Sequence, residues 1–221
     1  MSKPCCPHGA ARFAAAGALL AFCVSAPAQP ANDRCIDAIA VVGQGTVAFS
    51  NVGATTDGPS PCAEQGADVW ARYVPTAPGS IEVSTCTPAL TFDTVVSAYR
   101  ECPEDPNDVA LLLGCNDDGP DSLCELSGGS LLRVPVGWAP VIIQIGGKGG
   151  QQGECELSVT PCTADFDADG VIGLGDLAIL LADYGVACGS AAACDGDLEP
   201  DGDVDLTDLA VLLGRFGTEC P

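Results

Sequence analysis

An internal repeat near the C-terminus limits the possible folds of this chain more than any other feature of its sequence. Residues 162–188 align with residues 194–220 at an offset of 32, and 12 of the 27 aligned positions are identical. Repeated segments form similar structural units, and each unit buries its apolar side against its neighbour. The C-terminal part is therefore expected to be a pair of related units.

Each copy opens with acidic residues at alternating positions, followed by a glycine. Numbered from the first carboxylate, acids stand at positions 1, 3, 5 and 12 and glycine at position 6. Alternate residues of a tightly turning loop converge on one point, and Ca²⁺ takes roughly six to eight oxygen ligands. Position 7 offers only its backbone carbonyl. The expected metal ligands are Asp165, Asp167, Asp169, Val171 and Asp176 in the first loop, and Asp197, Glu199, Asp201, Asp203 and Asp208 in the second.

Other loop positions carry further expectations. Position 9 usually acts through water, a role that Asp205 fits, whereas Gly173 has no side chain to offer. Position 12 is aspartate rather than the usual glutamate, so the following helix must start closer to the ion. At position 8, Ile172 and Val204 suit a short β contact between the two loops.

A helix is expected after each loop. Apolar residues recur at i, i+3, i+4 and i+7, which is one face of an amphipathic helix. Gly185 and Gly217 follow, where a glycine would end the helix. We expect the two stripes to pack on each other: Leu177, Leu180, Leu181 and Tyr184 against Leu209, Leu212, Leu213 and Phe216.

Loop followed by helix, twice, with aspartate at position 12 and no preceding helix, resembles a type I dockerin over about residues 162–221. The resemblance implies two bound calcium ions and docking onto a cohesin-like module or another cell-surface component. Partner contacts in that family involve loop positions 10 and 11, which are Leu174-Gly175 and Leu206-Thr207 here. Well-known cellulosomal members have Ser-Thr there, so the identity of the partner stays open.

Four cysteines frame the repeats: Cys162 and Cys194 precede the loops, and Cys188 and Cys220 follow the helices. A helix from about 176 to 184 separates the two ends of one copy by roughly 13 Å, whereas a disulfide needs Cα atoms within about 7 Å. If the units pack antiparallel, the start of one lies beside the end of the other. We therefore predict disulfides Cys162–Cys220 and Cys188–Cys194. The pairing of the other mature cysteines stays open: Cys35, Cys62, Cys86, Cys102, Cys115, Cys124 and Cys155.

Residues 29–161 are expected to form a β-sandwich or jelly roll, because short apolar runs alternate with turn signals and no helical pattern stands out. Ile81 and Val83 alternate with polar neighbours, as do Ile143 and Ile145 around Gln144. The expected strands are 68–76, 79–87, 93–100, 109–115, 130–137, 139–146 and 153–160.

The phrases DVW, VSTC, FDT, CNDD and IGG follow one another over about residues 70–160, and their order resembles the pre-peptidase C-terminal modules of secreted bacterial proteins. The resemblance implies a non-catalytic attachment or binding unit. Some of these modules bind calcium, so Asp117 and Asp118 are candidate ligands, with a carboxylate-capped turn as the alternative. The glycine-rich run 146–150 lacks the phosphate-loop spacing and is interpreted as a hairpin turn.

The first 28 residues read as a secretory signal peptide with a cut after Ala28: a basic start, an apolar run over 13–24, then an A-x-A site. A lipoprotein signal would use Cys23, but Phe22 stands where that signal needs a small residue. No later run is apolar enough to span a membrane. We therefore expect a secreted or surface-associated protein of bacterial type, with residues 29–161 and 162–221 as its two domains.

The mature chain is strongly acidic, since 30 acidic residues stand against six basic ones, a net charge of about −24. Such a field disfavours nucleic acid and anionic membranes. The one histidine, His8, lies in the signal peptide, so no imidazole is left for catalysis.

Three classes of function follow: a non-catalytic calcium-dependent anchoring protein, which we favour; a carbohydrate-binding module with a dockerin; and a small polysaccharide-degrading enzyme that uses a carboxylate pair. The second class needs an exposed aromatic platform, for which the candidates are Trp70, Tyr73, Tyr99 and Trp138, although a core role is the ordinary one for such residues.

Overall fold

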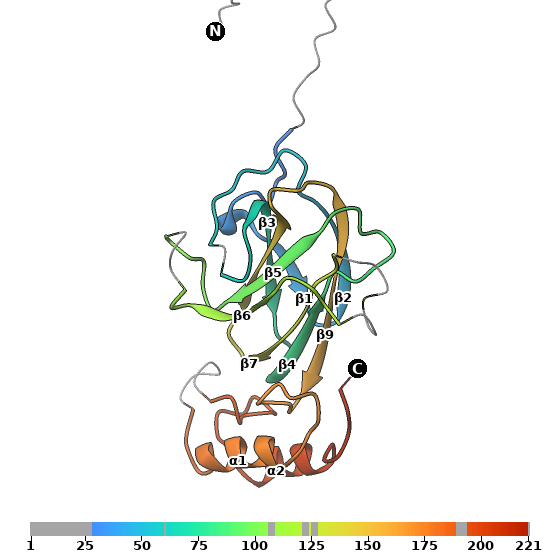
Figure 1. The fold of residues 1–221 in the computed structure, drawn as a ribbon. Coiled ribbons are helices and arrows are strands. Elements are labelled where there is room, and N and C mark those ends of the chain that lie inside the picture. Colours follow the sequence, from blue (N-terminus) through green and yellow to red (C-terminus); the bar gives the residue numbers. More distant parts are fainter. Residues whose placement is uncertain are drawn as a thin grey trace, which may run out of the picture.

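The computed structural model describes residues 28–59, 61–105, 109–120, 124, 128–188 and 194–220. The expected signal peptide lies outside these residues except for Ala28. A β-sandwich forms one end of the molecule and a small helical unit the other (Figure 1). The described part of the chain is thus mainly β with two short α-helices.

Within the described residues, nine strands and a short 3-10 helix make up the sandwich, and the smaller unit adds two α-helices. One sheet has the order β1-β3-β8-β5-β6 and the other β2-β9-β4-β7. The pair β1–β3 is parallel, and the other pairs are antiparallel. The elements are η1 (Cys35–Asp37), β1 (Ile39–Val42), β2 (Gly45–Ser50), β3 (Gln65–Val74), β4 (Gly79–Ser84), β5 (Thr94–Tyr99), β6 (Leu112–Asn116), β7 (Leu131–Val136), β8 (Val141–Lys148), β9 (Glu154–Thr163), α1 (Leu174–Asp183) and α2 (Leu206–Leu213).

Apolar side chains from both sheets meet in one core, as the predicted sandwich requires. Ile81 and Val83 are fully buried from one sheet, and Ile143 and Ile145 from the other. All seven expected strands are present. Gln144, expected on a solvent-facing side, is instead buried: the chain at Gly58 lies against its amide, and the Tyr99 hydroxyl donates to its side-chain oxygen at 3.1 Å. Its amide donates to Asp68 Oδ2 at 2.7 Å.

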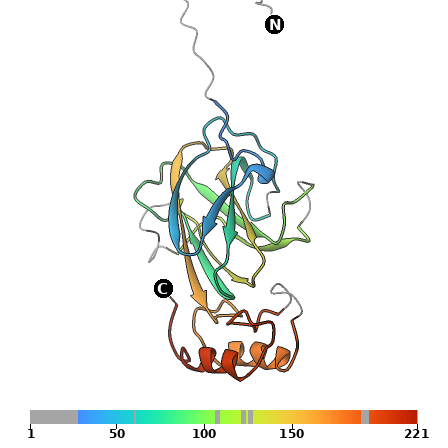
Figure 2. The ribbon, with the colours of Figure 1, turned by 180° about the vertical axis from the view of Figure 1, so that it is seen from behind.

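Two strands were not predicted. β1 and β2 lie at the edges of their sheets, as seen from behind in Figure 2. Most of their side chains are exposed or half-buried, so their sequences lack a strong apolar pattern. The glycine-rich run 146–150, expected to be a hairpin turn, is one only in part: residues 146–148 belong to β8, and Gly149 and Gly150 form the turn, at φ of 59° and 80°.

Both parts of the molecule contain disulfides. The two predicted bonds of the smaller unit, Cys162–Cys220 and Cys188–Cys194, are confirmed. The sandwich contains three more, and among the described cysteines the buried Cys155 has no disulfide partner. The three bonds of the sandwich are Cys35–Cys102, Cys62–Cys115 and Cys86–Cys124.

The smaller unit has pseudo-twofold symmetry, as the antiparallel arrangement required. Val171 forms a β bridge with Glu219, and one repeat later Asp203 forms the same bridge with Ala187. Each loop thus pairs with the segment that follows the other copy's helix. The expected loop-to-loop contact at position 8 is therefore wrong: the Ile172 N–H donates to the carbonyl of residue 218, not to the other loop.

Only half of the residues in the two apolar stripes are packed in the core, so the expectation that the whole stripes pack on each other is wrong. Leu180 and Leu212 are fully buried, and Leu177 and Leu209 are half-buried. The remaining members of the stripes are exposed: Leu181, Tyr184, Leu213 and Phe216. The reason is that the paired loop and post-helix segments, rather than a second helix layer, close the core beneath the helices.

Candidate metal centre

The first loop brings together the acids at positions 1, 3 and 5. Carboxylate oxygens of Asp165, Asp167 and Asp169 lie within 4.8 Å of one another. Gly170 turns the chain with a φ of 90°, a conformation that favours glycine. The Val171 N–H donates to Asp169 Oδ1 at 2.8 Å, which fixes that carboxylate over the turn. These three residues converge as the spacing predicts.

Asp165 and Asp197, the first carboxylates of the two loops, are buried and incompletely hydrogen-bonded. They are 0% and 1% exposed, and Oδ1 of each has no hydrogen-bond partner among the described residues. An unsatisfied buried polar group costs about 1–3 kcal/mol, and more if charged. A cation bound in each loop would give the Oδ1 atom of that loop a partner. The same orphaned oxygen at position 1 of each loop fits a hard, oxygen-preferring ion such as Ca²⁺.

The carboxylates at position 12 organise the loop backbone. Asp176 is fully buried, and it accepts from the Phe166 N–H at 2.6 Å and from the Gly173 N–H at 2.7 Å. Asp208 makes the equivalent two contacts at 2.7 and 2.8 Å. A carboxylate oxygen has more than one lone pair, so these bonds leave room for a metal. Neither residue belongs to the close group of acids, so their role as ligands stays a prediction.

The second loop is more open than the first. Asp197, Glu199 and Asp201, all of which the structure describes, do not form a group of three within 4.8 Å. Asp205 accepts from the Thr207 N–H at 2.7 Å and so caps α2, a different role from the water-mediated one expected. At position 7, Val171 and its counterpart Asp203 take part in the β bridges.

The crowded acids perturb one another. Burial raises the pKa of Asp167, and the neighbouring carboxylates of Asp176, Asp169 and Asp165 add to the shift, while the Asp169 N–H opposes it. Burial likewise raises the pKa of Asp197, with Asp208 as the largest charged contributor. Both shifts report negative charge held away from water, which a bound cation would offset.

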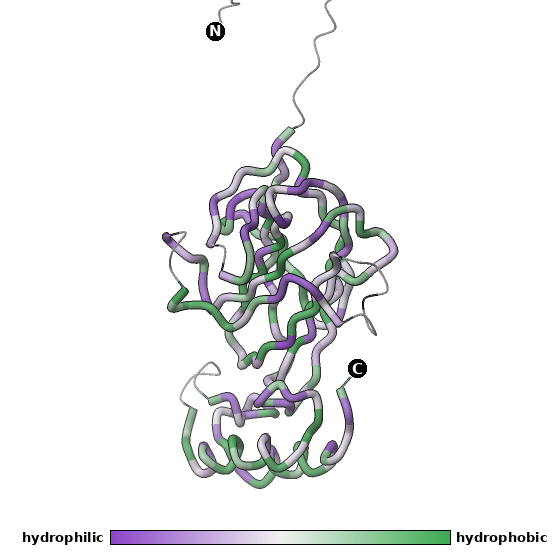
Figure 3. Tube along the Cα trace, in the orientation of Figure 1, coloured by the Kyte–Doolittle hydropathy of each residue, from purple (hydrophilic) through white to green (hydrophobic). Residues whose placement is uncertain are grey.

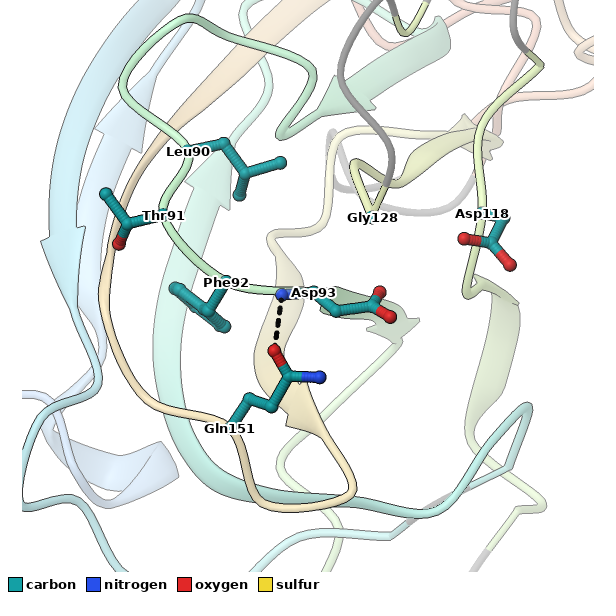
Figure 4. A pocket seen from close by; sticks show the side chains of 7 residues that line it. All are labelled: Leu90, Thr91, Phe92, Asp93, Asp118, Gly128 and Gln151. Carbon is teal, nitrogen blue, oxygen red and sulfur yellow. Dashed lines mark hydrogen bonds between the residues drawn. The ribbon is translucent and has the colours of Figure 1, made fainter.

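A second group of acids lies in the sandwich beside a cavity of about 490 Å³ (Figure 4). Asp93, Asp117 and Asp118 have carboxylate oxygens within 4.8 Å of one another. The Lys148 ammonium group lies 2.7 Å from Asp117 and 3.4 Å from Asp118. The hydrogen bond to Asp117 raises the pKa of Lys148. The chain's own cation therefore already binds this group and offsets one of its three negative charges, which favours the capped-turn interpretation over a further calcium site.

The aromatic residues do not form an exposed platform. Trp70, Tyr73 and Tyr99 are buried in the sandwich. Trp138 is half-buried, and its indole Nε1 donates to the Asp197 carbonyl oxygen at 2.9 Å. The core interpretation therefore holds for three of the four residues, and the fourth lies against the second loop.

Three contacts between the sandwich and the loops were not predicted from sequence. The Ser80 hydroxyl donates to Asp165 Oδ2 at 2.6 Å, and the Arg133 guanidinium lies against Gly170. Trp138 makes the third. A serine and an arginine in β-strands give no sequence signal for such roles, because the register that brings β4 and β7 to the loop depends on tertiary structure.

Comparison with known proteins concerns the sandwich. It is similar to the crystal structure of the pre-peptidase C-terminal domain of collagenase from Bacillus anthracis, with a TM-score of 0.37 and 9% sequence identity. The match covers 56% of this chain and 94% of that domain. No family model and no curated protein matches the sequence. No helix in the described part of the chain has the length and apolarity needed to cross a membrane.

Proposed function

We propose that this chain is a secreted, non-catalytic, calcium-binding protein with a dockerin-like C-terminal unit. That unit docks onto a cohesin-like module or another cell-surface component, and the sandwich serves attachment or binding. Five disulfides among the described cysteines support an oxidising, extracellular setting.

The observation that carries the calcium proposal is the unpartnered, buried Oδ1 at position 1 of both loops. Two copies of one sequence pattern place the same unsatisfied oxygen in the same position, which an acidic surface evolved only for solubility does not require. Asp165, Asp167 and Asp169 converge beside it in the first loop. When bound, the ion supplies the positive charge that these carboxylates lack.

Calorimetric titration of the mature chain with calcium tests this proposal. We expect about two ions per chain. Asp169→Ala and Asp201→Ala should each remove one site, because these exposed position-5 acids are ligands that make little other contact. Asp183→Ala, a change of an acid at the end of α1, is the matched control and should leave both sites intact. A chain that takes up no calcium would refute the proposal.

Docking is supported by apolar side chains that both copies expose at equivalent positions. Leu174 and Leu206, at loop position 10, are 76% and 69% exposed. Leu181 and Leu213 on the helices are also exposed. Figure 3 shows both helices as hydrophobic, and they lie at the end of the molecule away from the sandwich. Exposed apolar groups gathered in this way mark interaction surfaces.

The docking test uses a cohesin module as the probe in surface plasmon resonance. Leu181→Asp combined with Leu213→Asp should abolish binding, and calcium chelation should do the same. Val42→Asp is the control, since Val42 is an exposed apolar residue on β1 in the sandwich. If the parent chain and the double variant bind equally, these helices do not form the docking surface.

Of the alternatives, the carbohydrate-binding module loses support because three of its four candidate aromatic residues are buried. The enzyme alternative is tested directly: we expect the purified chain to hydrolyse no polysaccharide, ester or peptide. Turnover that a single carboxylate substitution abolishes would contradict the non-catalytic assignment.

A further inference from the structure

The first loop is joined to the sandwich without a linker. β9 pairs with β4 as far as Thr163, opposite Gly79, so the strand crosses the boundary expected between 161 and 162. The next residue, Ala164, is fully buried, and its N–H donates to the Pro78 carbonyl oxygen at 3.1 Å. Asp165 follows directly. The position of the first loop is therefore set by the ends of two paired central strands, β4 and β9.

Ser80 extends this connection to a candidate metal ligand. It is 1% exposed, and its hydroxyl donates to Asp165 Oδ2 at 2.6 Å. With Oδ2 held in this way, the unpartnered Oδ1 is the oxygen left for the ion. A hydrogen bond from outside the ligand set commonly orients a metal ligand and tunes its affinity.

In the second loop, no side chain of the described residues makes an equivalent bond to the first carboxylate. Asp197 Oδ2 accepts from the Gly202 N–H at 3.2 Å, a bond made within its own loop. Among the described residues, the hydrogen bond from the sandwich to Asp197 goes to its backbone carbonyl and comes from the Trp138 indole. Two loops that match in sequence and symmetry thus differ in how their first carboxylate is held.

Arg133 adds a second difference. Its guanidinium is paired with Glu82 at 2.8 Å and lies against Gly170, so that a Cβ at Gly170 would meet Nη1. At the equivalent Gly202, nothing lies within 4 Å of such a Cβ. The turn of the first loop is therefore enclosed by β7, whereas the turn of the second loop is open.

We propose that the sandwich completes the first calcium site, with Ser80 as the positioning residue for Asp165, so that calcium binding at this site is coupled to the sandwich through the Ser80–Asp165 hydrogen bond. This inference rests on the calcium binding proposed above. The second site is independent of the sandwich hydroxyl. One chain then carries two calcium sites of similar sequence, of which the affinity of the first depends on Ser80 of the sandwich and that of the second does not.

The test measures each site separately by calorimetry of the full chain. In an Asp201→Ala background only the first site remains, and there Ser80→Ala should weaken calcium binding by about 10- to 100-fold. In an Asp169→Ala background only the second site remains, and Ser80→Ala should leave its affinity unchanged. Ser84→Ala is the control, because Ser84 lies on the same strand and its hydroxyl oxygen accepts from the nearby Cys86 N–H rather than contacting a loop carboxylate of the described residues.

A second readout separates positioning from general stability. Calcium should slow hydrogen exchange at the Ala164 amide in the Asp201→Ala chain but not in the Asp169→Ala chain. Ser80→Thr retains a hydroxyl and should restore affinity if Ser80→Ala loses it. An effect of Ser80→Ala equal to that of Ser84→Ala, with two calcium ions still bound by the parent, refutes the coupling alone. A parent chain that binds no calcium refutes the proposed function as well.

Discussion

Removing the disulfide Cys162–Cys220 should destabilise the C-terminal unit more than removing Cys188–Cys194. The first bond links residues 58 apart in sequence, and the second links residues 6 apart. The chain-entropy relation gives about 4 kcal/mol for the longer closure and about 2 kcal/mol for the shorter. We therefore expect the two double serine variants to differ in free energy of unfolding by about 2 kcal/mol.

The assay is urea unfolding of the oxidised full chain with calcium chelated, followed by far-ultraviolet circular dichroism. The α-helices of the described chain, α1 and α2, both lie in this unit, so the helical signal reports on its unfolding. Calcium at saturation should raise the stability of both variants by mass action and leave their difference in place.

Two results would contradict the predicted roles of these disulfides. The variant without Cys162–Cys220 should unfold at a lower urea concentration than the variant without Cys188–Cys194. If it does not, loop-closure entropy does not explain how these bonds stabilise the unit. If peptide mapping of the parent shows Cys162 linked to Cys188, the antiparallel arrangement of the two units is itself wrong.

Further predictions concern a thiol, two glycines and one buried carboxylate. Burial raises the pKa of Cys155 to about 12, so iodoacetamide should label this thiol only after unfolding, and rapid labelling of the native chain would contradict its burial. Gly170→Ala should cost more stability than Gly202→Ala in urea unfolding: both have φ near 90°, with a penalty of about 1–2 kcal/mol, but only Gly170 also faces an arginine side chain. Asp176→Asn should lower the unfolding free energy of the C-terminal unit by about 1–3 kcal/mol, because its carboxylate accepts from buried backbone amides, whereas Asp183→Asn should change it little.

Much of the fold follows from local sequence. The strands of the sandwich core are recognisable because each must turn apolar side chains inward, as Ile81 and Val83 do. The disulfides of the C-terminal unit follow from the repeat and from the length of a helix. β1 and β2 escaped prediction because edge strands bury few side chains and need no regular apolar pattern.

The helix faces and the contacts around the loops could not be predicted in the same way. Leu180 and Leu181 are adjacent leucines with equal apolar character, and only the tertiary arrangement buries the first and exposes the second. Ser80 reaches Asp165 across 85 residues of sequence through the register of β4 with β9. Asp117 shows the opposite error: its sequence context suggests a metal ligand, but in the fold its carboxylate pairs with Lys148, 31 residues away in the sequence.

The route by which mechanical load would cross this molecule follows from the position of β9. A pull on the C-terminal unit would reach the sandwich through Cys162, which is covalently bonded to Cys220 and therefore holds both ends of the unit at one point. From there tension enters β9, which lies inside its sheet between β2 and β4. Withdrawing that strand lengthwise would shear both ladders at once, rather than opening one hydrogen bond after another. A unit joined to a sheet in this way would resist force applied along the axis of β9.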